Sequence, residues 1–345
     1  MKGLYFFVVI CMVFLLPVSL WGKSQCRTPG PPIFGMALDG YPITQKRLLQ
    51  VQQTIGLSPG VVLFFLQWPS LASQRDAHFP GESLNAIWQA GAIPCLTWEP
   101  MYYKDGQEIM VPYEEIINGA YDPYIEAFAR QAALWPNPFM LRFAHEMNIR
   151  RYHWGTLSEQ YGPKSPKIYQ KMFRYVVKKF RQAGALNVRW VFCPNAESLP
   201  SPIFASSAPW NCIENYYPGD RYVDIFGIDG YNWGNSQTKE EHGWDSQWND
   251  FKTIFSKAFA ALREINPEKP IFIFETACVR QGGDREVWIK QAFEILKSWQ
   301  IEGLIWFQVD KNQDWRLTAD KDAAILDFIR MHTSYPQQWI KEQTP

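Results

Sequence analysis

The sequence predicts a single (β/α)8 TIM barrel, because short apolar segments alternate with longer amphipathic ones along most of the chain. Eight apolar segments have the length of a β-strand, and they occur at residues 33–40, 61–68, 92–100, 139–146, 188–197, 222–232, 271–279 and 304–310. Most are apolar at nearly every position, which is typical of parallel strands that are buried on both faces. Eight such strands, each followed by a helix, form this barrel.

The segments between these strands have the apolar spacing of amphipathic helices. The clearest helical segments are residues 43–56, 122–135, 166–184, 246–265 and 284–299. The main alternative is an open, doubly wound sheet, which uses the same alternation of strands and helices. No GxGxxG or GxxxxGKS/T motif follows the first strand, so the sequence favours the closed barrel.

The fourth and seventh apolar segments end in a glutamate. In the fourth, Arg142 stands between apolar neighbours and the segment ends at His145 and Glu146, while the seventh reaches Glu275 after four apolar residues. The carboxyl ends of barrel strands meet at one face, where barrel enzymes build their active sites. Two carboxylates across a barrel mouth are the arrangement of glycoside hydrolases, which predicts that class of enzyme.

A retaining mechanism needs one ionised carboxylate as nucleophile and one protonated carboxyl as acid. We assign Glu275 as the nucleophile and Glu146 as the acid/base, because the charge of Glu275 would raise the pKa of Glu146. Arg142 is four residues from Glu146 and is expected to share its strand face. A buried arginine needs an anion, and Asp229 or Glu275 is the expected partner; the alternative is that Arg142 and an aspartate only tie the barrel together.

The composition argues against a charged polymer as partner. Lys plus Arg and Asp plus Glu both number 34, so the formal net charge is zero, and neither nucleic acid nor an acidic membrane surface is expected. Aromatic residues make up 16% of the chain, with 16 Trp and 16 Tyr. Such residues either fill the core or line a groove that stacks on sugar rings.

The N-terminus has the pattern of a secretory signal. Lys2 precedes an apolar run over residues 4–22 that Pro17 interrupts, and polar residues follow it. We therefore expect a signal peptide at residues 1–24, a single catalytic domain at residues 27–345 and a secreted or extracytoplasmic protein. The alternative is an uncleaved membrane anchor, because the run approaches the length that spans a bilayer.

The cysteines do not predict a metal site. There are six, of which Cys11 lies in the expected signal, and the remaining five are Cys26, Cys95, Cys193, Cys212 and Cys278. These allow at most two disulfides and leave one thiol over, with Cys193–Cys212 as one candidate pairing. Because no CxxC motif or Cys/His cluster occurs, we expect neither a metal nor a cofactor.

Four motifs carry a resemblance to a known family. They are GAIPCLTWEP at residues 91–100, HEMN at 145–148, YYPGDRYVDIFGIDGYNW at 216–233 and IFIFET at 271–276. Over about residues 30–310 the chain resembles glycoside hydrolase family 26, a family of retaining β-mannanases and β-glucanases on (β/α)8 barrels. The resemblance implies that Glu146 is the acid/base, that Glu275 is the nucleophile, and that Tyr231, in a motif that begins at Asp229, contacts the nucleophile.

Further residues near the expected mouth are candidates for substrate binding. We expect Trp306 to stack on the sugar beside the cleaved bond, and His145 to support Glu146 or to bind a sugar hydroxyl. Core packing is the alternative for each tryptophan. The other candidate sugar platforms are Trp98, Trp154, Trp233 and Trp244.

These observations predict a retaining, endo-acting glycoside hydrolase that cleaves β-1,4-mannosidic bonds in mannan-type polysaccharides. The alternatives are an endo-β-1,3-1,4-glucanase of the same family and a non-catalytic carbohydrate-binding barrel. The chain departs from the mannanase pattern at residues 149–153 and at Phe307, so these positions are expected to set substrate preference. We expect a monomer that acts on its polysaccharide without an obligate protein partner.

Overall fold

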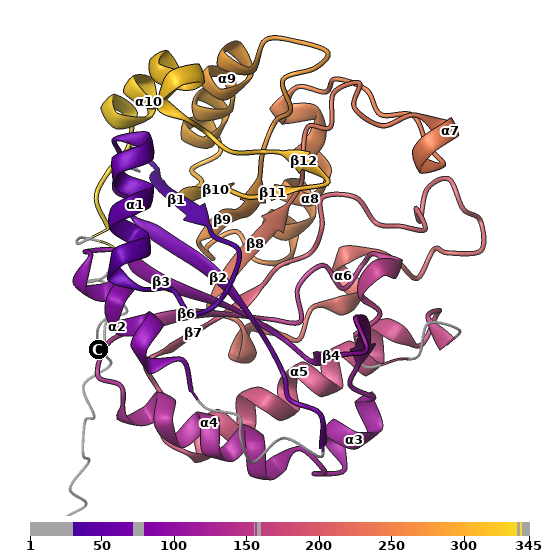
Figure 1. Cartoon of the computed structure of the whole chain (residues 1–345). Helices are drawn as coiled ribbons and strands as arrows, with labels where there is room; N and C mark the ends of the chain where they lie inside the picture. The colour runs from indigo at the N-terminus through magenta and orange to yellow at the C-terminus, as the bar shows by residue number, and fades with distance from the viewer. Residues whose placement is uncertain (1–29, 72–78, 155, 157–159, 337–338, 340–345) are drawn as a thin grey trace, which may run out of the picture.

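The chain folds into a closed barrel of eight parallel strands surrounded by helices (Figure 1). The computed structural model describes residues 30–71, 79–154, 156, 160–336 and 339. The strand order is β1-β10-β9-β8-β7-β6-β3-β2, and β2 pairs with β1 to close the barrel. The predicted (β/α)8 barrel is confirmed, and the open sheet is excluded.

All eight predicted strands belong to the barrel, although several end earlier than expected. The strands are β1 (Ile33–Ala37), β2 (Val61–Gln67), β3 (Ile93–Glu99), β6 (Phe139–Phe143), β7 (Val188–Phe192), β8 (Ile225–Asp229), β9 (Ile271–Thr276) and β10 (Gly303–Phe307). Because β6 ends at Phe143, residues 144–148 form a turn at the mouth instead of the last part of the strand.

The five predicted helical segments each contain a helix, and α2 and α10 are additional. The longer helices are α1 (Gln45–Ile55), α2 (Gly81–Gln89), α4 (Asp122–Leu134), α5 (Ser165–Gln182), α8 (Phe251–Ile265), α9 (Arg285–Ser298) and α10 (Ala319–His332). Thr44, Asp250 and Asp284 cap α1, α8 and α9 by accepting a hydrogen bond from a backbone N–H of the first turn. Figure 1 shows α1, α9 and α10 on one side of the barrel and α4 and α5 on the other.

The long connections at the carboxyl ends of the strands contain short elements. Residues 101–121 form a hairpin of β4 (Met101–Lys104) and β5 (Gln107–Met110) followed by α3 (Tyr113–Ile117). The remaining short elements are η2 (Arg150–Tyr152), α6 (Ile213–Tyr216), η4 (Asp220–Tyr222), α7 (Lys239–His242), β11 (Asp310–Lys311) and β12 (Gln313–Asp314). Apart from η4, which directly precedes β8 at the opposite end of the barrel, these segments lie on the side of the predicted site.

The barrel carries two apolar layers, because its strands are buried on both faces. The inner layer, on the barrel axis, is made by Ile33, Ala37, Val61, Leu63, Ile93, Cys95, Met140, Val191, Cys193, Ile225, Phe272, Phe274 and Ile305. Trp339 packs edge-on against Phe272 at the end of the barrel opposite the mouth, with ring centres 5.8 Å apart. A Cβ at Gly227 would lie 2.6 Å from the Sγ of Cys193, so this position on the axis has room only for glycine.

The described cysteines are all free thiols. Cys193 faces the barrel axis, whereas Cys212 directly precedes α6 outside the barrel, so the candidate pairing Cys193–Cys212 is wrong. Cys95 and Cys278 are also unpaired. Cys26 and the expected signal peptide at residues 1–24 lie outside the described residues. Within the described ranges, no helix has the length and apolar character needed to cross a bilayer.

Candidate active site

Arg142 stands at the centre of the site. It lies near the end of β6 and is fully buried. Its Nη1 binds Asp229 on β8 and its Nη2 binds Glu275 on β9, while its Nε donates to the Oγ1 of Thr97 on β3 at 2.9 Å. The sequence left open which carboxylate would be the partner, and the structure gives Arg142 both.

A β-bulge in β9 turns Glu275 toward the barrel axis. Phe272 and Phe274 face the axis, so strict alternation would point Glu275 at the surrounding helices. The pairing between β8 and β9 shifts register between Ile228 and Asp229. The extra residue re-aims the glutamate, as bulges beside active sites commonly do.

Two donors hold the Glu275 carboxylate. Arg142 binds its Oε1, and the Oη of Tyr231 donates to its Oε2 at 2.6 Å. The contact between Tyr231 and Glu275 that the family resemblance implied is therefore present. Both donors stabilise the negative charge of the carboxylate.

Glu146 lies in the turn after β6 and reaches the mouth by a route the sequence did not predict. Its backbone N–H donates to the carbonyl oxygen of Cys193 at 2.8 Å, and the Nδ2 of Asn195 donates to its Oε1 at 2.7 Å. The φ angles of Ala144 and Glu146 are 49° and 51°, which side chains with a Cβ rarely adopt. The expected strand position of Glu146, on the same strand face as Arg142, is therefore wrong; contacts with the end of β7 hold the turn instead.

The environment of Glu146 favours its protonated form. Its pKa is raised to about 7, first by burial and second by the negative charge of Glu275. The hydrogen bond from Asn195 and the charges of Arg142 and Arg151 oppose this rise. Glu146 and Glu275 thus interact electrostatically across the mouth, and their surroundings differ: Glu275 receives a guanidinium and a phenol, whereas Glu146 is buried beside an amide.

His145 is a neutral residue in the wall of the mouth. Burial lowers the pKa of its imidazole well below the usual range, and the charges of Arg142, Arg151 and Lys311 lower it further. The centre of its ring lies 4.8 Å from the ring centre of Tyr152. Within the described part of the chain its buried Nδ1 has no hydrogen-bond partner.

One group among the described residues has the spacing of a metal site. Potential ligand atoms of His145, Asp229 and Glu275 all lie within 4.8 Å of one another. Both carboxylates already bind Arg142, whose single positive charge offsets part of their negative charge. This donor set therefore fits the guanidinium better than a divalent cation.

Trp98 and Trp306 are not accessible to a substrate. Trp98 is fully buried and packs on Phe128, with ring centres 4.6 Å apart. Trp306 is also buried, and its Nε1 donates to the carbonyl oxygen of Trp315 at 2.9 Å. The prediction that Trp98 and Trp306 bind sugar is wrong, because both point from their strands toward the helices.

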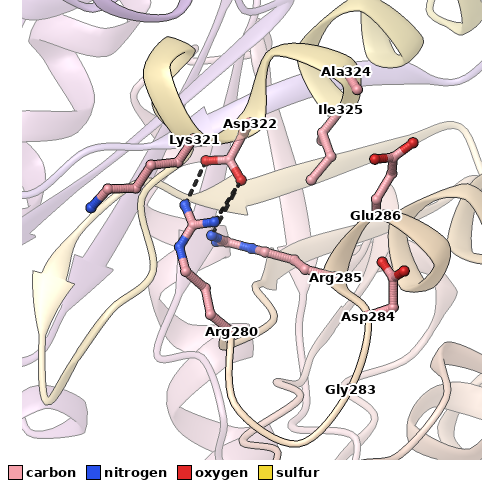
Figure 2. A pocket seen from close by; sticks show the side chains of 9 residues that line it. All are labelled: Arg280, Gly283, Asp284, Arg285, Glu286, Lys321, Asp322, Ala324 and Ile325. Carbon is pink, nitrogen blue, oxygen red and sulfur yellow. Dashed lines mark hydrogen bonds and ion pairs between the residues drawn. The ribbon is translucent and has the colours of Figure 1, made fainter.

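The side chains of Arg280, Arg285 and Asp322 form an ion-pair cluster (Figure 2). This cluster lies beside Trp306 on the helix side. Arg280 and Arg285 converge on the buried carboxylate of Asp322 in α10, with N–O distances of 2.7 and 3.7 Å. The guanidinium of Arg285 lies 5.1 Å from the ring of Trp306. The cavity beside this cluster, about 450 Å³, is lined by three basic and three acidic side chains. Because the positive and negative charges that line the cavity are equal in number, the cavity does not favour a charged ligand. The ion pairs of the cluster join the loop after β9 to α10.

Trp154 packs in the wall of the mouth and holds the backbone of His145, the residue before Glu146. It is 3% exposed, stacks on Tyr152 with ring centres 4.9 Å apart, and donates from Nε1 to the carbonyl oxygen of His145. The prediction of Trp154 as a sugar platform is therefore wrong. Tyr152 is half-buried and is the more accessible ring of this stacked pair.

Trp233 and Trp244 lie in the connection after β8 and remain candidate sugar platforms. Their rings contact each other at 6.0 Å between centres, and Trp233 also packs on Trp315 at 4.9 Å. Trp244 is 45% exposed. Toward Glu275, the ring centre of Tyr231, which donates to that carboxylate, lies 6.1 Å from that of Trp233. This aromatic group thus extends from the Glu275 carboxylate to the protein surface.

Sequence reasoning missed Asn195 and Glu99 at the mouth, and it assigned the inward position at the end of β10 to the wrong aromatic residue. Phe307 packs against the inner layer and contacts Tyr231 at 5.6 Å between ring centres, so it holds the inward position that was assigned to Trp306. Asn195 binds Glu146 but gave no signal, because an asparagine after a strand is common in turns. Glu99 ends β3, and the carboxylate-after-strand signal that singled out Glu146 and Glu275 applies to it equally.

Comparison with known proteins identifies the family. The family model for glycosyl hydrolase family 26 matches residues 113–277. Endoglucanase H of Acetivibrio thermocellus is 31% identical over 282 residues, which is 81% of this chain. These matches relate the chain to glycosyl hydrolase family 26. The family predicted from the motifs is therefore confirmed.

Two further comparisons agree with this result. A mannan endo-1,4-β-mannosidase of Bacillus subtilis is 29% identical over 99 residues, or 27% of this chain. The structure of a family 26 β-mannanase from Bacteroides ovatus matches with a TM-score of 0.59 and 18% identity, covering 87% of this chain and 88% of that chain, and it shows the shared fold. The chain spans 28% of the length of endoglucanase H and 23% of that of the mannosidase.

Replacing Arg142 by leucine should lower the free energy of unfolding by roughly 3–5 kcal/mol, because it leaves Asp229 and Glu275 buried without a counter-charge. Denaturant unfolding followed by circular dichroism measures the change. Arg151→Leu is the matched control, since Arg151 pairs with Glu108 at the surface with 47% of its side chain exposed; its loss should cost less than about 1 kcal/mol. Equal losses in the two variants would contradict the central role of Arg142.

Proposed function

We propose that this family 26 protein is a retaining, endo-acting glycoside hydrolase that cleaves β-1,4-mannosidic bonds in mannan-type polysaccharides. The observation that carries the proposal is the contrast between two glutamates at one mouth. Glu275 is bound by Arg142 and Tyr231, which favours a charged nucleophile. Glu146 is buried with a pKa raised to about 7, which suits a general acid at neutral pH.

In the first step Glu275 attacks the anomeric carbon while Glu146 protonates the departing glycosidic oxygen. Arg142 and Tyr231 fix the direction of the attacking carboxylate, since each binds one of its oxygens. The product of this step is a covalent glycosyl-enzyme, in which Glu275 carries no charge.

In the second step Glu146 acts as a base. The charge of Glu275 helps to raise the pKa of Glu146, and glycosylation of Glu275 removes that charge. The pKa of Glu146 therefore falls, and Glu146 can take a proton from the water that releases the sugar. Two inversions at the anomeric carbon give a product with retained β configuration.

Mixed-linkage β-glucan is the second candidate substrate. The relative that aligns with 81% of this chain carries the name endoglucanase, whereas the mannosidase aligns with 27%. The two sugars differ in the orientation of the 2-hydroxyl, so the choice between them depends on side chains around that group and not on the two glutamates. The departures from the mannanase pattern at residues 149–153 and Phe307 lie at this mouth.

The proposed enzyme is exported and works on its own. Residues 1–24 serve as a secretory signal in this proposal, and residues 27–345 form the catalytic domain, which acts as a monomer on an extracellular polysaccharide. The charge balance of the chain supports a neutral polymer as the partner.

The assigned roles of Glu275 as nucleophile and Glu146 as acid/base can be tested by chemical rescue. Glu275→Ala should abolish turnover of every substrate, whereas Glu146→Ala should still form the covalent intermediate from an activated aryl glycoside, which needs little acid assistance. Added azide should then restore turnover of the Glu146 variant and yield a β-glycosyl azide, measured by proton NMR. Absence of rescue, or an α-glycosyl azide from this variant, would overturn the assignment of roles.

Activity should fall on the alkaline side as Glu146 ionises, so kcat/KM on a polysaccharide should decrease above about pH 7. Asn195→Ala removes a hydrogen bond that stabilises the ionised carboxylate, which raises the pKa of Glu146 and should move this decrease to higher pH. The pH dependence of kcat/KM measures the shift. Asn118→Ala, at an exposed position, is the control; an Asn195 profile that matched this control would contradict the role of the hydrogen bond.

Substrate preference should respond to the turn over the mouth. Arg151 binds Glu108 at 2.6 and 2.8 Å and lies over the ring of Tyr152, which contacts His145. Replacing residues 149–153 by a segment rich in glycine and aromatic residues should change the ratio of mannan to mixed-linkage glucan kcat/KM about tenfold, or about 1.4 kcal/mol.

The control for this exchange is Arg150→Ala, because Arg150 is exposed in the same turn. It should leave the ratio of the two kcat/KM values unchanged. A folded, active exchange variant with the ratio of the unmodified protein would show that this turn is only a scaffold.

A further inference from the structure

A third carboxylate occupies the mouth, and the two-glutamate mechanism does not use it. Glu99 is the last residue of β3 and is 3% exposed. It follows Cys95 and Thr97 in alternation on the strand; Cys95 belongs to the inner layer and Thr97 binds Arg142. Glu99 therefore faces the barrel axis, two residues beyond Thr97 and nearer to the mouth.

Glu99 has few partners for a buried carboxylate. The Nε2 of Gln67, the neighbouring residue on β2, donates to its Oε2 at 2.5 Å. Among the described residues no arginine or lysine is paired with it in an ion pair. A buried carboxylate without a cation beside it is costly unless other donors stabilise its charge.

The surroundings of Glu99 connect it to the catalytic pair and to the turn over the mouth. Its pKa is raised to about 7, mainly by burial; Gln67 and Arg142 oppose the rise, and the charges of Glu275 and Glu108 add to it. Arg151, Tyr152 and Tyr103 also interact electrostatically with Glu99. The groups that face it therefore come from β2, β4, β5, β6, β9 and η2.

We propose that Glu99 is a substrate-binding residue that accepts a hydrogen bond from a hydroxyl of the sugar seated beside Glu275, and that Gln67 positions its carboxylate. The inference rests on the proposed function, because it takes a sugar at Glu275 as given. Each pyranose of a β-1,4-linked polymer keeps free hydroxyl donors, and Glu99 at the end of β3 faces the axis where that sugar would lie. A hydrogen bond to a charged acceptor is stronger than a neutral one.

This arrangement gives binding and chemistry opposite pH dependence. Glu99 must be ionised to accept the hydroxyl, so KM should rise as the pH falls below about 7. Glu146 must be protonated to act as an acid, so kcat should fall as the pH rises above about 7. A carboxyl that only supports the fold would leave KM independent of its protonation in the folded enzyme.

The test compares Glu99→Gln with the unmodified full-length enzyme on a short β-1,4-mannan or mixed-linkage glucan oligosaccharide. The variant keeps the shape and loses the charged acceptor, so KM should increase roughly ten- to hundredfold, with kcat changed far less, and the rise of KM at low pH should disappear. Gln67→Leu removes the hydrogen bond that lowers the pKa of Glu99, so the rise of KM should begin at higher pH. Glu114→Gln, exposed on α3 of the connection that follows β3, is the matched control and should change nothing.

Binding without turnover separates this inference from the proposed function. Calorimetry with the same oligosaccharides should show about tenfold weaker binding to Glu146→Ala/Glu99→Gln than to Glu146→Ala. An active enzyme whose KM, pH profile and binding are unchanged by Glu99→Gln would overturn the role of Glu99 alone. An inactive wild-type protein that still binds sugar through Glu99 would overturn the hydrolase proposal alone, and a protein that neither binds nor cleaves would overturn both.

Discussion

The ion pairs of one buried guanidinium are the constraint on which the rest of the site depends. Arg142 reaches across the barrel axis from β6 to Asp229 on β8 and Glu275 on β9, and it also binds Thr97 on β3. Two carboxylates on adjacent strands would repel each other in this dry interior. A planar guanidinium presents separate nitrogen donors to the two carboxylates in a fixed geometry, whereas the ammonium of a lysine would offer donors from a single nitrogen atom. Arg142 therefore fixes Glu275 in place as it compensates the charge.

The two principal glutamates reach the mouth through departures from regular strand geometry. A bulge in β9 re-aims Glu275, and a turn with positive φ at Ala144 and Glu146 carries the other carboxylate beyond the end of β6. The sequence was sufficient to predict eight strands and to select both glutamates, because apolar segments and carboxylates at their ends are visible in the residues themselves. Bulges and left-handed turns arise from pairing with neighbouring strands, so the residues alone did not reveal how either side chain is aimed.

The aromatic residues show a second limit of prediction from sequence. Strands that are apolar on both faces carry no alternation that distinguishes the barrel axis from the helix layer. Trp306 and Phe307 are adjacent, and only the register of β10 makes Phe307 face the axis while Trp306 packs under Arg285. The narrow interior combines large residues such as Phe274 with small ones such as Cys95 and requires glycine at Gly227. The wider layer beneath the helices accepts Trp98.

The acidic residues at the mouth differ in their distance from the one buried cation, Arg142. This difference separates the roles that we propose for them. Asp229 and Glu275 contact Arg142 directly, so Glu275 can remain a charged nucleophile. Glu146 and Glu99 feel the same guanidinium only at a distance, and each receives an amide, from Asn195 or Gln67, in its place. An amide hydrogen bond does not offset the cost of burying a full charge, so the pKa values of both glutamates rise to about 7. Of the three glutamates, only Glu275 contacts the arginine directly, and this difference in surroundings separates the proposed nucleophile from the acid and the hydroxyl acceptor at the same mouth.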